Sequence, residues 1–205
     1  MYLIKTPFFL RWIYPSLIWR KSNSSHSIYI TFDDGPIPKV TPFVLETLKK
    51  YNAKATFFCI GDNVRKHPGI FEDIKKEGHA IGNHTYNHLK GWKTSTTQYI
   101  DNYLKCDELV DSSLFRPPYG RIKRRQISKL KQLNSDLKII MWDVLSGDFD
   151  QNLSPEECLN NVLKYTCPGS IIVFHDSLKA FHRLEYVLPR ALEKWHSEGY
   201  KFAIL

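Results

Sequence analysis

The stretch Ile30-Thr31-Phe32-Asp33-Asp34-Gly35-Pro36 sets the main question about this sequence, because an apolar run stops at two adjacent carboxylates. The run before the acids is typical of a buried strand, and the Gly-Pro pair indicates a turn directly after it. Two neighbouring aspartate side chains repel each other, so the pair is costly unless a cation or a hydrogen-bond donor separates their roles. We therefore expect a positively charged partner beside Asp33 and Asp34.

The composition predicts one folded domain. The chain has 205 residues, of which 42% are hydrophobic and 14% aromatic, and its net charge is +8. A chain of this kind can bury a substantial core, which argues against disorder. Lys5, Arg11 and Arg20 interrupt the apolar residues at the N-terminus, so no transmembrane helix is expected. The positive charge permits an anionic partner, but it gives no specific reason to expect nucleic acid.

Residues 1–26 are expected to form an N-terminal arm, and residues 27–205 the domain. The arm segment 12–19 is about as long as the shortest signal-peptide core, but it contains Pro15 and lacks a clear small-residue cleavage site behind it. In one interpretation the arm packs under the domain. In the other, its aromatic and basic residues make a peripheral contact with a membrane surface.

Short apolar stretches recur along the chain, with helical patterns between them. Strands are expected over residues 27–33, 53–60, 79–83, 114–116, 137–142, 170–174 and 200–204. Helices are expected over residues 40–51 and 70–77, and from Ser154, which can form a capping box with Glu157. Strict alternation predicts a parallel α/β sheet, and seven units without a linker predict closure into a barrel. Chemistry in such folds collects at the carboxyl ends of the strands.

Two histidines four residues apart follow the third expected strand, in Asn83-His84-Thr85-Tyr86-Asn87-His88. Side chains at i and i+4 share one face of a helical turn, so both imidazoles can reach one metal ion. HxxxH alone fits a polar helix face equally well, but a strand-end aspartate in the same layer favours a metal site. Two nitrogen donors and one carboxylate leave a position open for water, as in a catalytic zinc site.

Three further strand ends carry ionisable residues. The fourth expected strand runs into Arg116-Pro117-Pro118-Tyr119, where the prolines stiffen a turn that either places the arginine at the rim or leaves it solvated. The fifth leads into a loop that contains Asp143 and Asp148, and the sixth delivers His175. Ionisable residues at five strand ends indicate a chemical site at one rim.

From about Ile28 to the C-terminus, the sequence resembles the polysaccharide deacetylases that share the NodB homology domain, also called carbohydrate esterase family 4. The stretches 31–36, 84–88 and 116–119 resemble the first three family motifs, in the family order. The resemblance implies a distorted (β/α)7 barrel, which agrees with the seven expected strands. It also implies a divalent metal, for which Zn²⁺ is the first choice and Co²⁺ or Ni²⁺ are alternatives.

The resemblance implies a role for each matched position. Asp34, His84 and His88 would bind the metal. Asp33 would be the general base that takes a proton from water, kept ionised by the metal charge and by Arg116.

The remaining implied roles concern the acyl group and the leaving amine. The main-chain N–H of Tyr119 would help to hold the developing oxyanion. His175 would protonate the departing amine. Asp148 would orient the His175 imidazole, although Asp143 in the same loop is an alternative.

Two positions depart from the family pattern. Asp148-Phe149 stands where the family has Asp-Trp, and Val173-Phe174-His175 stands where it has Leu-x-His. Both changes are apolar, so we expect an altered fit around the acetyl group rather than lost chemistry. The residues expected to contact the substrate are Pro117, Pro118, Phe149 and Val173.

The sequence therefore predicts a metal-dependent hydrolase that removes N-acetyl groups from an amino-sugar polymer, either peptidoglycan or a chitin-like oligosaccharide. An O-acetyl esterase or small-amide hydrolase with the same metal centre is one alternative. A non-catalytic carbohydrate-binding domain is another, but binding alone does not require a base, an acid and an open metal site. The basic run over residues 121–125 forms either a groove for an anionic polymer or a solvated face.

The compartment is not fixed by the sequence. Cell-wall chemistry favours an external enzyme, whereas the four cysteines without CxxC spacing and the missing cleavage site favour an internal one. On balance, a cytoplasmic or membrane-associated protein is expected rather than a secreted one. The sequence indicates no particular oligomeric state.

Overall fold

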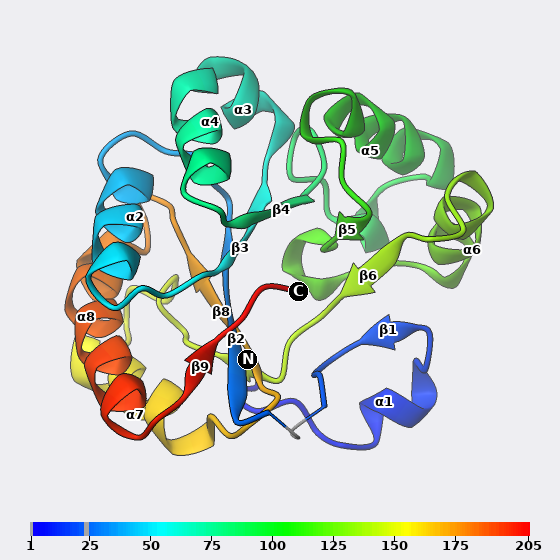
Figure 1. The fold of residues 1–205 in the computed structure, drawn as a ribbon. Coiled ribbons are helices and arrows are strands. Elements are labelled where there is room, and N and C mark those ends of the chain that lie inside the picture. Colours follow the sequence, from blue (N-terminus) through cyan, green and yellow to red (C-terminus); the bar gives the residue numbers. More distant parts are fainter. Residues whose placement is uncertain (1, 23–24) are drawn as a thin grey trace.

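The computed structural model describes residues 2–22 and 25–205, which form a single α/β domain around a curled parallel sheet (Figure 1). The strands are β1 (Leu17–Ile18), β2 (Ser27–Asp33), β3 (Thr56–Cys59), β4 (Ala80–Asn83), β5 (Leu114–Phe115), β6 (Lys138–Ile140), β7 (Val144–Leu145), β8 (Ile171–His175) and β9 (Lys201–Phe202). Their spatial order is β1-β6-β5-β4-β3-β2-β8-β7, with β9 beside β2. Because all these strand pairs are parallel, their carboxyl ends share one rim.

Helices cover the outside of the curled sheet (Figure 1). They are α1 (Leu10–Ile13), α2 (Val40–Lys50), α3 (Gly61–Lys66), α4 (Pro68–Lys76), α5 (Thr96–Val110), α6 (Arg124–Leu133), α7 (Pro155–Tyr165) and α8 (Phe181–Ser197), with short 3₁₀ turns η1 (Gly91–Lys93) and η2 (Pro118–Gly120). The expected capping box is present at α7, where Ser154 Oγ accepts a hydrogen bond from Glu157 N at 3.1 Å. This bond satisfies one of the main-chain donors left open at a helix start.

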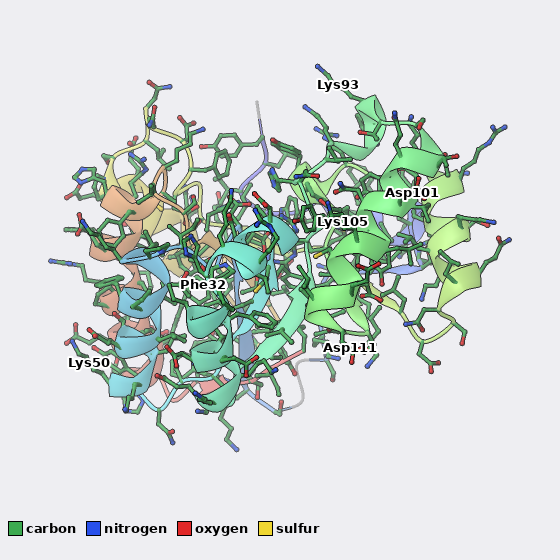
Figure 2. The ribbon with its side chains drawn as sticks, turned by 90° about the horizontal axis from the view of Figure 1, so that it is seen from above. Phe32, Lys50, Lys93, Asp101, Lys105 and Asp111 are labelled. Carbon is green, nitrogen blue, oxygen red and sulfur yellow. The ribbon has the colours of Figure 1, made fainter. Side chains whose placement is uncertain are left out.

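Aromatic side chains from three adjacent strands pack in the core between the sheet and the helices α2 and α8. The ring of Phe32 on β2 stacks on Phe57 of β3 at 5.0 Å and on Phe174 of β8 at 5.9 Å. Seen from above, Phe32 lies in the interior, whereas Lys50 and Asp111 lie at the periphery (Figure 2). This packing fixes β2, and therefore the two aspartates at its end, against both neighbouring strands.

All seven expected strands are present, most of them a few residues shorter than their apolar runs. Two strands were not expected, β1 and β7, which have two residues each. A stretch of two residues is too short to show any alternation, so only the pairing with β6 and β8 reveals these strands.

The described residues of the arm lie between β6 and β7, which are not neighbours in the sheet. On one side β1 pairs with β6, and on the other Lys5 forms an antiparallel bridge with Val144 of β7. A buried carboxylate, Asp143, anchors this contact: Lys5 Nζ lies 2.7 Å and Arg11 Nη2 3.2 Å from its oxygens. Residues 1, 23 and 24 of the expected arm lie outside the described residues.

The described part of the chain contains no helix with the length and apolar character needed to cross a bilayer. The longest helix, α8, has charged residues along its length and packs against α7 and α2.

Candidate metal and catalytic centre

Four strand ends bring the expected metal ligands, base and acid to one rim. Asp33 ends β2, and His175, which ends β8, is its register partner across the sheet. His84 follows β4 directly, and Arg116 follows β5. Residues that are far apart in the sequence therefore meet because parallel strands place their carboxyl ends side by side.

Asp34, His84 and His88 form a group that can hold a metal ion, since their ligand atoms all lie within 4.8 Å of one another. Oδ1 of Asp34 is 3.7 Å from Nε2 of His84 and 3.2 Å from Nε2 of His88. Asp34 has a φ of 84° and His88 a φ of 56°, values uncommon for residues other than glycine. Strained backbone at both positions is consistent with a loop held in shape for binding.

The protonation states of the two histidines explain why this group fits a cation. Burial lowers the pKa of both imidazoles, so both rings are neutral near pH 7. Nδ1 of His84 lies 2.8 Å from the main-chain oxygen of Arg116, which can only accept, so Nδ1 carries the proton. Nε2 of His84 therefore has no proton, and its lone pair faces the carboxylate of Asp34.

The carboxylate oxygen completes this fit. Oδ1 of Asp34 is buried and has no hydrogen-bond partner among residues 2–22 and 25–205. A buried acceptor that faces another acceptor is costly, and a cation between them removes the cost. Two imidazole nitrogens and one carboxylate are donors that Zn²⁺ accepts, so the residues present fit a divalent metal of this type.

The loop that carries Asp34 is held by residues that no local sequence pattern indicates. Asn63 Nδ2 donates to the main-chain oxygen of Asp34 at 2.7 Å. The buried carboxyl group of Asp176 accepts from Gly35 N at 2.9 Å and from Thr41 Oγ1 at 2.6 Å. Burial raises the pKa of Asp176 to about 8. A Cβ atom at Gly35 would lie 2.0 Å from the Asp176 carboxylate, so the turn requires glycine.

Asp33 is paired with a buried cation, as the opening stretch predicts. Nη1 of Arg116 lies 2.7 Å from Oδ1 of Asp33 and 2.6 Å from Oγ1 of Thr31. Nη2 of Arg116 donates to the main-chain oxygen of Met141 at 3.0 Å, and the guanidinium lies 4.1 Å from the ring centroid of Phe58. Arg116 is thus a fixed internal cation rather than a solvated one.

His175 contacts Asp148, the residue favoured from the sequence. Nδ1 of His175 lies 2.7 Å from Oδ1 of Asp148, and His175 N donates to Oδ2 at 2.7 Å. Burial opposes the charged imidazole, but the Asp148 carboxylate outweighs it and raises the pKa of His175 to about 9. Asp143, the alternative, is occupied by Lys5 and by Ser170 Oγ at 2.7 Å.

The four residues expected to contact the substrate differ in exposure. Pro117 and Pro118 are buried and belong to the η2 turn. Val173 is 1% exposed because its side chain points into the interior of the domain. These three side chains are therefore buried at the rim, and their contact with a substrate stays a prediction. Phe149 is partly exposed, and its ring lies 5.2 Å from that of His175.

Tyr119 stands at the mouth of the centre. Its side chain is 57% exposed, and its ring centroid is 4.6 Å from that of His88. Its backbone has a φ of 60°, and Gly120 N donates to Pro117 O at 2.9 Å to close the turn. The ring of Tyr119 therefore lies next to the metal ligand His88, on a turn closed by a main-chain hydrogen bond.

Comparison with known proteins identifies the family of the chain. The family model described as polysaccharide deacetylase matches residues 20–137. A peptidoglycan-N-acetylglucosamine deacetylase of Bacillus cereus is 38% identical over 156 residues, which is 73% of this chain but 56% of the relative. The chain thus spans little more than half of that relative. A chitooligosaccharide deacetylase of Azorhizobium caulinodans is 37% identical over 77% of each chain.

Solved structures show the same fold. The Bc1960 peptidoglycan N-acetylglucosamine deacetylase superposes with a TM-score of 0.88 and 31% identity, over 98% of this chain and 95% of that one. A Bacillus anthracis protein described as a CE4 family pseudoenzyme superposes with a TM-score of 0.80 and 25% identity, over 91% and 66% of the two chains. Activity must therefore be inferred from the residues of the centre and not from the fold. On the family model and these relatives together, the chain belongs to the polysaccharide deacetylase family.

Proposed function

We propose that this protein is a metal-dependent hydrolase that removes N-acetyl groups from an amino-sugar polymer. One observation carries the proposal: the neutral imidazole nitrogen of His84 faces the unpartnered Oδ1 of Asp34, which calls for a cation. Asp33, a carboxylate paired with arginine, and His175, an imidazole that carries a proton, lie at the same rim as register partners. A base and an acid at the same rim as a metal position are what amide hydrolysis requires.

A divalent ion held by Asp34, His84 and His88 would supply Lewis acidity, which activates water and polarises the acetamide carbonyl. Asp33 accepts the proton that water loses as its oxygen bonds to the carbonyl carbon, and Arg116 holds the carboxylate of this base in place. The main-chain N–H of Tyr119 donates to the carbonyl oxygen as negative charge develops there. Zn²⁺ is the proposed metal, and Co²⁺ or Ni²⁺ would suit the same donors.

His175 completes the reaction. Its Nδ1–H is held by Asp148, so Nε2 is the atom that gives its proton to the sugar nitrogen as the C–N bond breaks. The products are acetate and a free amine. An amide nitrogen leaves only with an added proton, so an imidazole with a pKa of about 9 favours N-deacetylation over cleavage of an O-acetyl ester.

The proposed substrate is peptidoglycan or a chitin-type oligosaccharide, since the names of the two relatives above refer to these polymers. A non-catalytic carbohydrate-binding role is the second candidate, because the fold also occurs in a pseudoenzyme. The intact set of base, acid and metal-ligating residues favours catalysis.

The test is acetate release from N-acetylglucosamine oligomers and from peptidoglycan fragments. Chelated protein is assayed with and without added zinc, and Asp33→Asn serves as the blank. We expect zinc to restore release in the native protein and not in the variant. If zinc is bound but no acetate is released from either substrate, the activity is wrong and a binding role replaces it.

A further inference from the structure

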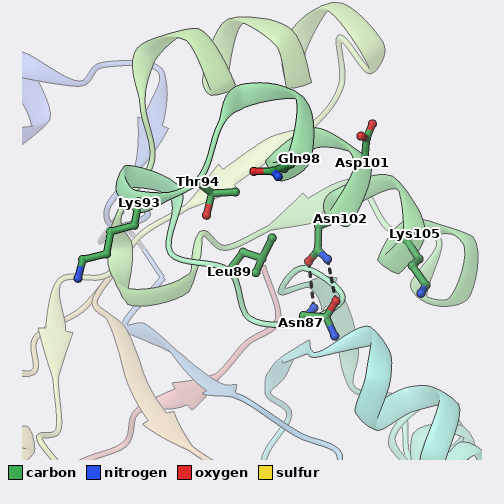
Figure 3. Close-up of a pocket in the computed structure, with 8 residues that line it drawn as sticks. All are labelled: Asn87, Leu89, Lys93, Thr94, Gln98, Asp101, Asn102 and Lys105. Atoms are coloured by element: carbon green, nitrogen blue, oxygen red, sulfur yellow. Dashed lines mark hydrogen bonds between the residues drawn. The ribbon is translucent and has the colours of Figure 1, made fainter.

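The segment of residues 87–94, which contains the metal ligand His88, directs its side chains to two sides. On one face, Asn87, Leu89, Lys93 and Thr94 border a cavity of about 550 Å³ against α5 (Figure 3). Asn87 is joined to Asn102 of α5 by hydrogen bonds from Asn102 Nδ2 and from Asn87 N, both of 2.9 Å. The side chains of the other face, Lys90 and Trp92, instead contact the segment that follows β5.

That second face continues the mouth of the metal centre. Lys90 Nζ lies 5.2 Å from the ring centroid of Tyr119, whose ring contacts His88. The Arg121 guanidinium lies 4.3 Å from the ring centroid of Trp92, and Trp92 Nε1 donates to the main-chain oxygen of Ile122 at 3.2 Å. Aromatic rings and cations therefore form a row that starts at the metal ligands.

Three features of this row suit a ligand. The Tyr119 and Trp92 side chains are 57% and 53% exposed, although large apolar side chains gain from burial. Trp92 is oriented by its indole hydrogen bond and by Arg121, so its ring is fixed before any ligand arrives. Neither Lys90 nor Arg121 has a carboxylate partner within 4.0 Å among residues 2–22 and 25–205.

The surrounding charge specifies the kind of ligand. Residues 112–135 contain seven lysine and arginine residues and no acidic residue. Such a segment produces a positive potential that attracts anions. Aromatic rings offer flat apolar surfaces to the C–H face of a sugar, and ammonium and guanidinium groups bind carboxylates.

We propose that Lys90, Trp92, Arg121 and Tyr119 bind a carboxylate-bearing sugar next to the sugar that is deacetylated. The proposal rests on the function proposed above and selects between its substrates. Glycans that alternate N-acetylglucosamine with a lactyl-substituted sugar carry such a carboxylate wherever the lactyl group bears no peptide, whereas chitin-type chains carry none. This row is therefore a determinant of specificity for the acidic polymer.

The test compares two tetrasaccharides of equal length, one of alternating N-acetylglucosamine and N-acetylmuramic acid and one of N-acetylglucosamine only. The variants are Lys90→Gln and Arg121→Gln, and the matched controls Lys93→Gln and Lys105→Gln remove charges at the opposite face. We expect each of the first two to lower the preference for the acidic tetrasaccharide about five- to tenfold, mainly through KM. The controls should keep the native preference.

Equal losses on both tetrasaccharides, or an equal effect of the controls, would overturn the proposal. Calorimetric titration of zinc-loaded Asp33→Asn with the two tetrasaccharides measures the same preference without turnover. If the native protein releases no acetate but this titration still shows a preference that Lys90→Gln removes, then the proposed activity fails and the binding site stands.

A second surface, on the arm, carries an independent inference. Phe8, Phe9, Trp12 and Ile13 are 65%, 46%, 77% and 48% exposed, and the Phe8 ring makes edge contacts with Phe9 at 6.2 Å and with Trp12 at 5.5 Å. Four large apolar side chains exposed within six residues form a patch that water does not favour. Ile13 also borders a cavity of about 240 Å³ together with Arg124 of α6.

We infer that this patch docks on an anionic lipid bilayer, as aromatic side chains flanked by basic residues do at membrane interfaces. Residues 2–22 contain no acidic residue, and neither do residues 112–135, which include α6. A second copy of the chain seated on the patch would bring like charges together, whereas anionic headgroups would complement them.

The experiment is co-sedimentation with vesicles of phosphatidylcholine alone or mixed with phosphatidylserine. We expect binding to the mixed vesicles only, and at least a tenfold loss of binding in the double variant Phe8→Ser with Trp12→Ser. The control Leu109→Ser removes an apolar side chain that is 39% exposed on α5 and should keep native binding. Absence of vesicle binding, or a dimer in sedimentation velocity that the double variant abolishes, would overturn the inference.

Discussion

The guanidinium of Arg116 lies 2.7 Å from the carboxylate of Asp33, and both side chains are buried below the rim of the sheet. This contact joins β2 and β5, which are separated by β3 and β4 in the sheet. It also keeps Asp33 from competing with Asp34 for one cation. The two adjacent acids thus have separate partners, which is how the opening stretch avoids the repulsion between them.

Replacing Arg116 by methionine removes the cation and leaves Asp33 buried without its charge partner. We expect the free energy of unfolding to fall by about 3–5 kcal/mol, the usual cost of breaking a buried ion pair from one side. Urea unfolding followed by circular dichroism measures it. Arg121→Met, at an exposed position, is the control and should change stability by less than about 0.5 kcal/mol. Equal midpoints for the two variants would contradict the prediction.

Asp33→Asn keeps the size of the side chain and an acceptor oxygen for Arg116, but it removes the base. Acetate release should therefore fall about 10²- to 10⁴-fold while zinc remains bound. Steady-state kinetics and metal analysis of the same sample check both parts. Loss of zinc together with activity would show that Asp33 acts as a ligand instead.

His88→Ala removes one of the three donors, so the variant should lose zinc to a chelator at concentrations at which the native protein retains it. Metal content after dialysis against graded chelator gives the comparison. His182→Ala is the matched control, because the His182 side chain is 76% exposed and lies near Glu185 in the same helix. Equal retention of zinc by the His88 variant and the native protein would remove His88 from the metal site.

The acid His175 gives a pH dependence with a defined sign. Its pKa is raised to about 9, so the proton needed for the leaving amine is present below that pH, and kcat should fall as pH rises through about 9. The same proton stabilises the fold fully below the ordinary value of 6.5, and this stability is lost as pH rises toward 9.

Asp148→Asn tests the cause of that shift. Without the Asp148 carboxylate, burial is opposed only by the more distant charges of Asp34 and Asp33, so the alkaline limit of kcat should move to lower pH. A pH–rate profile with zinc saturating shows the movement. An unchanged alkaline limit would mean that another group sets it.

Asp176→Ala should cost about 1–3 kcal/mol of stability, because Gly35 N and the Thr41 hydroxyl lose their buried acceptor. Thermal and urea unfolding measure the change. Asp176→Asn keeps an acceptor for Gly35 N and should recover part of it. If the alanine variant is as stable as the native protein, the turn after Asp34 is held by other contacts.

The sequence predicted those features that depend on neighbouring residues. The capping box at Ser154 and Glu157 was found because both partners lie in one turn, and the end of β2 because a buried apolar run stops at acids. The role of Asp176 could not be predicted, because its partner Gly35 is 141 residues away and no local pattern indicates such a contact. The arrangement of parallel strand ends was predictable only in outline, since register and side-chain burial arise from packing across the sheet.

Burial of the expected substrate contacts also could not be predicted from the sequence. Pro117, Pro118 and Val173 flank expected site residues in the sequence, but strand alternation and the tight proline turn direct them inward. Phe149 reaches the surface because it lies in a loop. Adjacency in the sequence therefore does not predict the face that each side chain occupies.

The arm lies between β6 and β7, and its loss would expose strand edges that favour aggregation. Ile18 O accepts a hydrogen bond from Met141 N at 2.7 Å, and Ile4 O accepts one from Leu145 N at 2.8 Å, so the arm occupies main-chain groups beside both β6 and β7. A chain that lacked the arm would present two open strand edges on one molecule. Open edges template pairing with other chains, so such a chain would aggregate edge to edge.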